Sequence, residues 1–112
     1  MTALRMKRVG NVRDMTRVST HPGVMLRAEF LEPLNLSASA LAKELKIPAN
    51  RLTEIVGGRR SVTADTALRL ADRFGTSAEF WMNLQSLHDL TLAIVARKAA
   101  AKRAPPRRKS AA

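Results

Sequence analysis

The side chains best suited to recognising a ligand stand in one short stretch, "ANRLTEIVGGRR", residues 49–60. Asn50 can both donate to and accept from the edge of an adenine, and Thr53 offers a hydroxyl and a methyl group. Ala49 can touch a thymine methyl, and Arg51 can reach a guanine or a phosphate. These residue types, so close together, predict the reading of base edges in duplex DNA.

A second group of side chains can hold the phosphate backbone. Arg59 and Arg60 directly follow two glycines that should end a helix, and we predict that both arginines bind phosphate. Ser37 and Ser39 stand at the expected start of the preceding helix, where free backbone amides also attract phosphate. The sequence therefore predicts base contacts from the first group and backbone contacts from the second.

These side chains must be presented by two helices that are joined by a very short corner. Only residues 46–48 separate Leu45 from Ala49, so the two helices must cross steeply, as in a helix-turn-helix, whose second helix enters the major groove. Ala42 is small where the helices approach. Four larger residues are expected to fill the angle between the helices: Leu45, Ile47, Leu52 and Ile55. The alternative is an ordinary helical hairpin with a solvated polar face.

The remaining chain predicts an all-α domain of about five short helices, because no stretch alternates apolar and polar residues. Capping residues and proline mark the expected helix starts, at Thr20 to Gly23, Ser37, Pro48, Thr63 and Ser77. Proline and glycine mark the ends, at Pro33, Gly57-Gly58 and Gly75. The fourth helix is expected to point Leu68, Leu70, Ala71 and Phe74 inward. The fifth runs through Phe80, Trp81, Leu84 and Leu87 towards Val95.

The excess positive charge is confined to the two ends of the chain. The formal net charge is +11, yet residues 21–96 hold eight basic and eight acidic residues. Residues 1–20 hold five basic residues and one acidic residue, and residues 97–112 hold seven basic residues and no acid. Such ends attract phosphate without regard to sequence, so any specificity must come from the neutral middle. A solubilising role without a ligand is the alternative.

This charge pattern also predicts the domain organisation. We expect a basic arm over residues 1–19, a helix-turn-helix domain over 20–96 and a disordered basic tail over 97–112. Residues 97–104 could extend the last helix, but Pro105-Pro106 must stop it.

Several other kinds of protein are not indicated. The chain has no cysteine, and its longest fully apolar run, Leu92 to Ala96, is far too short to span a membrane. His21 and His88 stand 67 positions apart with no partner for a metal site, and no phosphate loop or nucleophile elbow is present. We expect no enzyme, no cofactor, no metal and no membrane partner, and a cytoplasmic location.

Three motifs together carry a resemblance to a known family. The segments "HPG", "TADTALRL" and "FGTSAEFWMNLQ", within residues 20–90, resemble the HigA-type antitoxins, also called the VapI-like helix-turn-helix group. The resemblance implies a fold of the lambda-repressor-like type and a homodimer that represses its own operon at a palindromic operator. It also implies binding and neutralisation of a HigB-type, mRNA-cleaving toxin. By position it assigns base reading to Asn50, Arg51 and Thr53, and DNA backbone contacts to Arg59 and Arg60.

The chain departs from that family at two positions. Lys46 holds the corner, where such motifs commonly have glycine; a left-handed backbone there costs about 1–2 kcal/mol. Gly57 stands where relatives often carry asparagine. Because family members commonly begin shortly before "HPG", translation from Met15 instead of Met1 is a further hypothesis, which intact-mass measurement of the native protein would test.

Two alternative functions remain open at this point. One is a stand-alone helix-turn-helix regulator without a toxin partner, and the other is a sequence-indifferent nucleic-acid packager that acts through the basic ends. The apolar continuation of the last helix is a separate question: part of it is expected to meet a second copy or a toxin, unless it packs back onto the first helix. Its residues are Leu90, Leu92, Ile94 and Val95.

Overall fold

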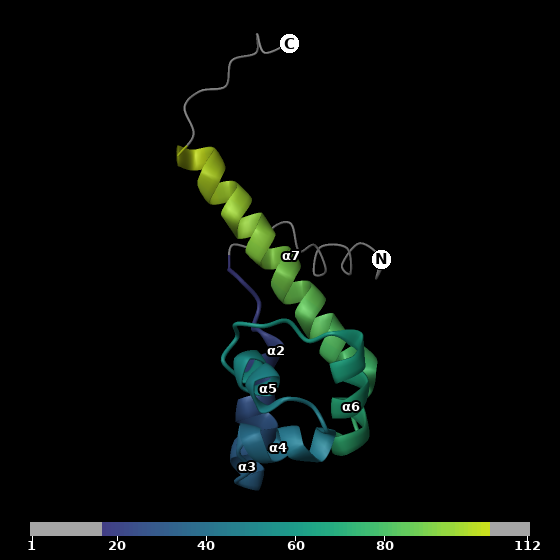
Figure 1. Cartoon of the computed structure of the whole chain (residues 1–112). Coiled ribbons are helices and arrows are strands. Elements are labelled where there is room, and N and C mark those ends of the chain that lie inside the picture. Colours follow the sequence, from purple (N-terminus) through teal and green to yellow (C-terminus); the bar gives the residue numbers. More distant parts are fainter. Residues whose placement is uncertain (1–16, 104–112) are drawn as a thin grey trace, which may run out of the picture. The chain divides into compact units, whose positions relative to one another are not determined.

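The computed structural model describes residues 17–103, and this part of the chain is helical with no strand. A continuous first helix is made of α2 (Pro22–Leu26), the π-helical segment η2 (Arg27–Leu31) and α3 (Glu32–Leu34). Four helices follow it: α4 (Ala38–Leu45), α5 (Ala49–Val56), α6 (Ala64–Phe74) and α7 (Ala78–Arg103) (Figure 1). The prediction of an all-α fold with five helices is confirmed.

The chain divides into two compact units. Residues Ser19–His88 form the larger unit, which holds the first helix, α4, α5, α6 and the first part of α7. The second unit takes in both ends of the chain, and its described portion is residues 17–18 and 89–103. Both helices of the predicted helix-turn-helix belong to the larger unit.

Short polar side chains begin the helices, largely as predicted. Ser37 Oγ accepts a hydrogen bond from the amide of Ala40 at 3.0 Å, and the hydroxyls of Thr63 and Ser77 cap α6 and α7 in the same way. The first helix differs: its cap is His21 rather than Thr20. His21 Nδ1 accepts from the amide of Gly23 at 2.8 Å. An imidazole nitrogen therefore replaces the expected hydroxyl.

The end of the first helix was predicted one residue too early. Pro33 does not stop the helix, which continues to Leu34 and ends at the left-handed Asn35. Proline lacks an N–H group and its ring crowds the carbonyl four residues earlier. The wider π-helical turn over Arg27–Leu31 directly precedes this region, and such turns shift the hydrogen-bond register that proline would otherwise interrupt.

The corner between α4 and α5 is a Schellman motif centred on Lys46. Its backbone has φ of 58°, which confirms the left-handed conformation considered for this position. The amide of Ile47 donates to the carbonyl of Ala42 at 3.1 Å, and the amide of Lys46 donates to the carbonyl of Lys43 at 3.2 Å. Ile47 is buried in the core, so the motif also supplies the apolar contact that usually accompanies it.

We expect Lys46→Gly to raise the free energy of unfolding by about 0.5–1 kcal/mol. Relief of about 1–2 kcal/mol of left-handed strain should exceed the extra backbone entropy that glycine has in the unfolded chain. Urea unfolding of the full chain measures the change. Asn35→Gly is the matched control: it has φ of 53°, but asparagine tolerates this conformation, so its gain should be smaller. A loss of stability in Lys46→Gly would contradict the prediction.

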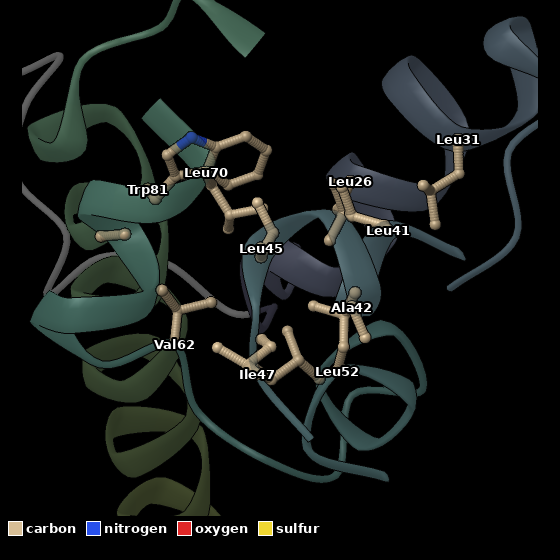
Figure 2. Packing of buried hydrophobic residues seen from close by; sticks show 12 residues of the cluster. Leu26, Leu31, Leu41, Ala42, Leu45, Ile47, Leu52, Val62, Leu70 and Trp81 are labelled. Carbon is tan, nitrogen blue, oxygen red and sulfur yellow. The ribbon is translucent and has the colours of Figure 1, made fainter. Parts of the chain in front are cut away.

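The core fills the angle between α4 and α5, as predicted. Figure 2 shows Ala42, Ile47 and Leu52 gathered between these helices. Leu45 and Ile55 are also buried, so all five predicted residues belong to the core. Trp81 from α7 is fully buried and its ring lies near Phe30 and Phe80. One inward prediction was wrong: Leu68 of α6 is 57% exposed, whereas Leu70 of the same helix is buried.

The last helix is longer than the predicted domain. α7 continues to Arg103, so residues 97–103 of the predicted disordered tail are helical. Alanine, lysine and arginine are strong helix formers, which explains the extension. Residues 104–112 lie outside the described residues, as does the predicted arm apart from residues 17–19. The expectation that 97–104 could extend the helix agrees with this result up to Arg103.

Candidate nucleic-acid interface

The first helix packs very closely against α5, near Ile55 on its buried face. A Cβ atom added to Gly23 would lie 1.8 Å from the carbonyl oxygen of Ile55, so only glycine allows the two backbones to approach this far. The cap residue of the same helix, His21, lies beneath the turn that ends α5: its Cγ would be 3.9 Å from a Cβ at Gly58. The position of α5 therefore depends on the start of α2.

The face of α5 away from the core carries the predicted base-reading residues. Leu52 and Ile55 are buried, whereas Ala49, Asn50 and Thr53 are exposed. Arg51 is partly buried. No side chain among residues 17–103 forms a hydrogen bond with the Asn50 amide, so its donors and acceptor face solvent. Sequence periodicity and structure agree about the orientation of this helix; the base contacts themselves stay a prediction.

The Thr53 hydroxyl forms a hydrogen bond within α5 that was not predicted from the sequence. Its hydroxyl donates to the carbonyl of Ala49 at 2.8 Å, one turn earlier. A threonine proton used in this way is not available to a base, so the hydroxyl can only accept. The methyl group is the other part of this exposed side chain that can meet a ligand, and a thymine methyl is its natural partner.

The serines at the start of α4 keep donors for phosphate. Ser37 accepts from the amide of Ala40 through its oxygen, which leaves its O–H free to donate. Ser39 is exposed in the first turn. A groove of about 470 Å³ runs beside this helix start, and Arg27, Leu36 and Val56 are among its lining residues. Ser37 and Ser39 thus lie on a solvent-accessible surface, and their phosphate contacts remain a prediction.

A second Schellman motif ends α5 directly before Arg59 and Arg60, the two predicted phosphate-binding arginines. Gly58 has φ of 77°, the amide of Arg59 donates to the carbonyl of Glu54 at 2.8 Å, and the amide of Gly58 donates to the carbonyl of Ile55 at 3.0 Å. A Cβ at Gly57 would lie 2.5 Å from Nη1 of Arg59. Gly57, which stands where relatives of the HigA-type family often carry asparagine, therefore leaves room for the Arg59 guanidinium.

Glu54 is a residue of this surface that sequence reasoning missed. Its carboxylate oxygen Oε1 accepts from Nε of Arg60 at 2.7 Å, and both side chains are exposed to solvent in part. The two residues are six positions apart and lie on either side of the helix end, so no helical spacing rule would have indicated the pair. Arg59 and Arg60 are both exposed, and both follow the turn that ends α5.

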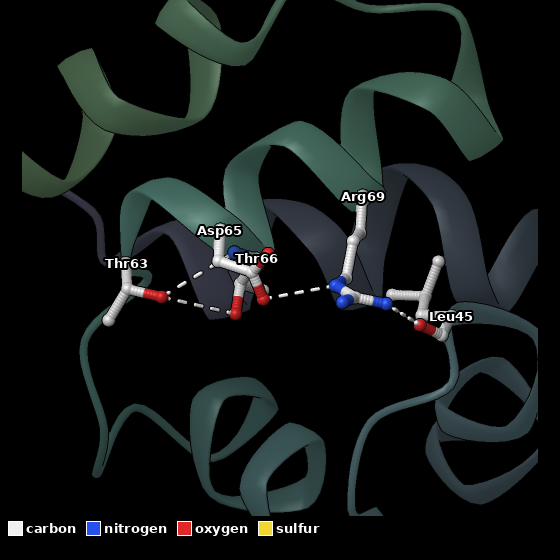
Figure 3. A network of polar contacts seen from close by, with 5 residues as sticks. All are labelled: Leu45, Thr63, Asp65, Thr66 and Arg69. Atoms are coloured by element: carbon white, nitrogen blue, oxygen red, sulfur yellow. Dashed lines mark hydrogen bonds and ion pairs between the residues drawn. The ribbon is translucent and has the colours of Figure 1, made fainter.

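Two arginines of α6 clamp the helix-turn-helix corner, and sequence reasoning missed both. Arg69 Nη1 donates to the carbonyl of Leu45 at 2.7 Å, while its Nε pairs with Asp65 at 3.0 Å (Figure 3). Arg73 pairs with Glu44 of α4. Arg69 thus satisfies one of the carbonyls left open at the end of α4. The i, i+4 spacing of Asp65 and Arg69 was the available signal, but it does not reveal the contact with Leu45.

Residues 17–103 contain neither a membrane-spanning helix nor a metal-binding cluster. No helix in this range is long and apolar enough to cross a membrane. No group of three or more histidine, aspartate or glutamate side chains lies close enough together there to hold a metal ion.

The chain is similar to a helix-turn-helix family and to a bacterial virulence-associated protein. Residues 28–81 match the family HTH_3, described as helix-turn-helix, and this range contains α4, the corner and α5. Virulence-associated protein I of Dichelobacter nodosus is 52% identical over 73 residues, which cover 65% of this chain and 68% of that protein.

Solved structures with the same fold include proteins described as antidotes and antitoxins. An addiction module antidote protein of a HigA family from Coxiella burnetii is 47% identical with a TM-score of 0.68, over 81% of this chain and 100% of that chain. The antitoxin HigA of Pseudomonas aeruginosa, solved with the higBA promoter, is 44% identical with a TM-score of 0.69, over 78% of this chain and 96% of that chain.

Proposed function

Since this chain belongs to the helix-turn-helix family that includes the HigA-type antitoxins, we propose that it binds operator DNA sequence-specifically and represses its own operon as an antitoxin. The observation that carries the proposal is the outer face of α5. Ala49, Asn50 and Thr53 are exposed there, on a helix whose other face is anchored by Leu52 and Ile55. Base contacts come from these residues and Arg51.

Backbone contacts flank the base contacts on both sides. Ser37 and Ser39 bind phosphate at the start of α4, and Arg59 and Arg60 bind it after the Schellman turn of α5. The hydrogen bond from Arg69 to the carbonyl of Leu45 joins α6 to the end of α4, directly before the corner that leads into α5, and so supports the corner that both sets of contacts depend on. This division assigns sequence reading to α5 and register to the groups around it.

Footprinting on the promoter of the chain's own operon tests the proposal. A homodimer on a palindromic operator should protect two half-sites about 34 Å apart, which is about one turn of duplex. Diffuse protection without a preferred sequence would instead support a packager that acts through the basic ends. Mass measurement of the protein–DNA complex gives the number of chains bound, and a single chain per operator would contradict the dimer.

The partner of the proposed antitoxin is a HigB-type, mRNA-cleaving toxin. Part of the exposed apolar surface of α7, where Leu90 and Leu92 are 48% and 49% exposed, is proposed to meet this toxin or the second copy. Pull-down from the native host tests this partner: a small basic ribonuclease is expected, and its absence would favour a stand-alone regulator. We propose no enzymatic activity for the chain itself, and a cytoplasmic site of action where operator DNA and mRNA occur.

Removal of residues 97–112 should weaken binding to all DNA about equally. This segment carries seven basic residues and no acid, so its loss should flatten the dependence of log K on log salt by up to about 6 while the preferred sequence stays the same. Fluorescence anisotropy over a salt series measures both quantities. A shorter truncation after Arg103 removes three of the seven charges and should give a proportionate effect. A changed sequence preference would contradict the assignment of roles.

A further inference from the structure

The backbone of Glu54 organises the turn that carries the two arginines. Its carbonyl accepts from the amide of Arg59, and its carboxylate accepts from Nε of Arg60 at 2.7 Å. One residue of α5 thus holds the backbone of the first arginine and the side chain of the second. Because Glu54 is part of α5, any rotation of the base-reading helix moves both arginines with it.

The geometry of the ion pair leaves the phosphate-binding edge of Arg60 available. A guanidinium presents five N–H groups, and a carboxylate bound at Nε occupies one edge of this plane. The hydrogens of the opposite edge remain free for a phosphate. The Arg60 side chain is 48% exposed, so solvent and ligand can reach it. A side chain that is already held in place loses less rotamer freedom when it binds.

The negative charge of Glu54 has a second effect on DNA binding. The surface formed by α5 and its turn carries Arg51, Arg59 and Arg60, and Glu54 is the acid among them. A carboxylate close to duplex DNA is repelled by every phosphate, whatever the sequence. This repulsion is offset only where Arg60 can bind a phosphate while Glu54 still holds its Nε. That condition requires a defined position of α5 in the groove.

We propose that Glu54 is a specificity-determining residue, which positions Arg60 on a phosphate in the operator register and penalises binding in any other register. The inference rests on the proposed function, because it assumes that Arg60 contacts the DNA backbone. It goes beyond that function by assigning discrimination to an acidic residue that contacts no base. Glu54 acts through Arg60, so it is a positioning residue.

The test compares Glu54→Ala and Glu54→Gln in the full chain on two duplexes. One is the segment protected in the chain's own promoter, and the other is a scrambled duplex of the same composition. Both variants should bind the scrambled duplex about threefold to tenfold more tightly, because a repulsive charge is gone. Glutamine can still accept from Arg60, so Glu54→Gln should keep operator affinity, whereas Glu54→Ala should lose it and show the larger fall in discrimination.

Glu44→Gln is the matched control, because Glu44 forms a comparable exposed ion pair with Arg73 between α4 and α6. It changes the net charge by the same amount but leaves Arg60 held, so its ratio of operator to scrambled affinity should stay that of the unmodified protein. A second control combines Glu54→Ala with Arg60→Gln. Relative to Arg60→Gln alone, the added Glu54 change should not lower operator affinity further.

Two results would overturn the inference while leaving the proposed function intact. One is an equal change of the affinity ratio in Glu44→Gln and Glu54→Ala, which would show an effect of net charge alone. The other is loss of operator affinity on Glu54→Ala even when Arg60 is already glutamine. If the unmodified protein does not distinguish the two duplexes at all, the proposed function itself is refuted, and the inference falls with it.

Discussion

Gly23→Ala is expected to lower the free energy of unfolding by about 3 kcal/mol or more, since it overpacks a backbone crossing that has no free space. The new Cβ would lie 1.8 Å from the carbonyl oxygen of Ile55 and 2.8 Å from its carbonyl carbon. Both atoms belong to the backbone, so rotation of a side chain cannot relieve the clash. The first helix must move away from α5, and urea unfolding measures the cost.

Gly75→Ala is the matched control for this prediction. Gly75 has φ of 75° and ends α6, but a Cβ there meets no atom within 4 Å. The control therefore carries only the left-handed strain, about 1–2 kcal/mol, without a clash. Equal losses in the two variants would contradict the claim that close packing of α2 on α5 requires Gly23. Binding of the surviving folded Gly23→Ala protein should also weaken, because α5 loses its support.

Asn50→Ala combined with Thr53→Ala is expected to abolish most of the sequence preference. Each good base contact contributes about 1–3 kcal/mol of discrimination, and a factor of ten corresponds to about 1.4 kcal/mol. The double variant should therefore lower the ratio of operator to scrambled affinity by about 25-fold or more if each contact is worth at least 1 kcal/mol. Affinity for scrambled DNA should hardly change, because no basic residue is removed.

The hydrogen bond of the Thr53 hydroxyl indicates which part of this side chain should read the base. Since its proton is donated to the carbonyl of Ala49, the methyl group should carry its part of the readout. Thr53→Val should then keep more discrimination than Thr53→Ser, which is the reverse of what a hydroxyl contact would give. Asn83→Ala, an exposed asparagine of α7, is a control that should leave the affinity ratio unchanged. A larger loss in Thr53→Val than in Thr53→Ser would refute the methyl contact.

Local chemistry was enough to predict the helices and the face that α5 presents. Ser37, Thr63 and Ser77 cap their helices by accepting hydrogen bonds from amides three residues ahead, so their roles can be predicted from the neighbouring sequence. The three-residue corner after Leu45 and the apolar spacing of Leu52 and Ile55 similarly determine which side of α5 faces the core. These interactions are short in sequence, and each residue type has few competing uses.

Tertiary packing decided the features that depend on residues far apart in the chain. Three features follow from the way in which whole helices pack together. They are the contact of Gly23 with Ile55, the hydrogen bond from Arg69 to the carbonyl of Leu45, and the exposure of Leu68. No local sequence pattern predicts these three features, because a glycine or an arginine is compatible with many local structures. The sequence by itself therefore determined a helix-turn-helix with a polar outer face. Only the fold decided which backbones touch and which carboxylate holds which arginine, since those distances arise when the core closes.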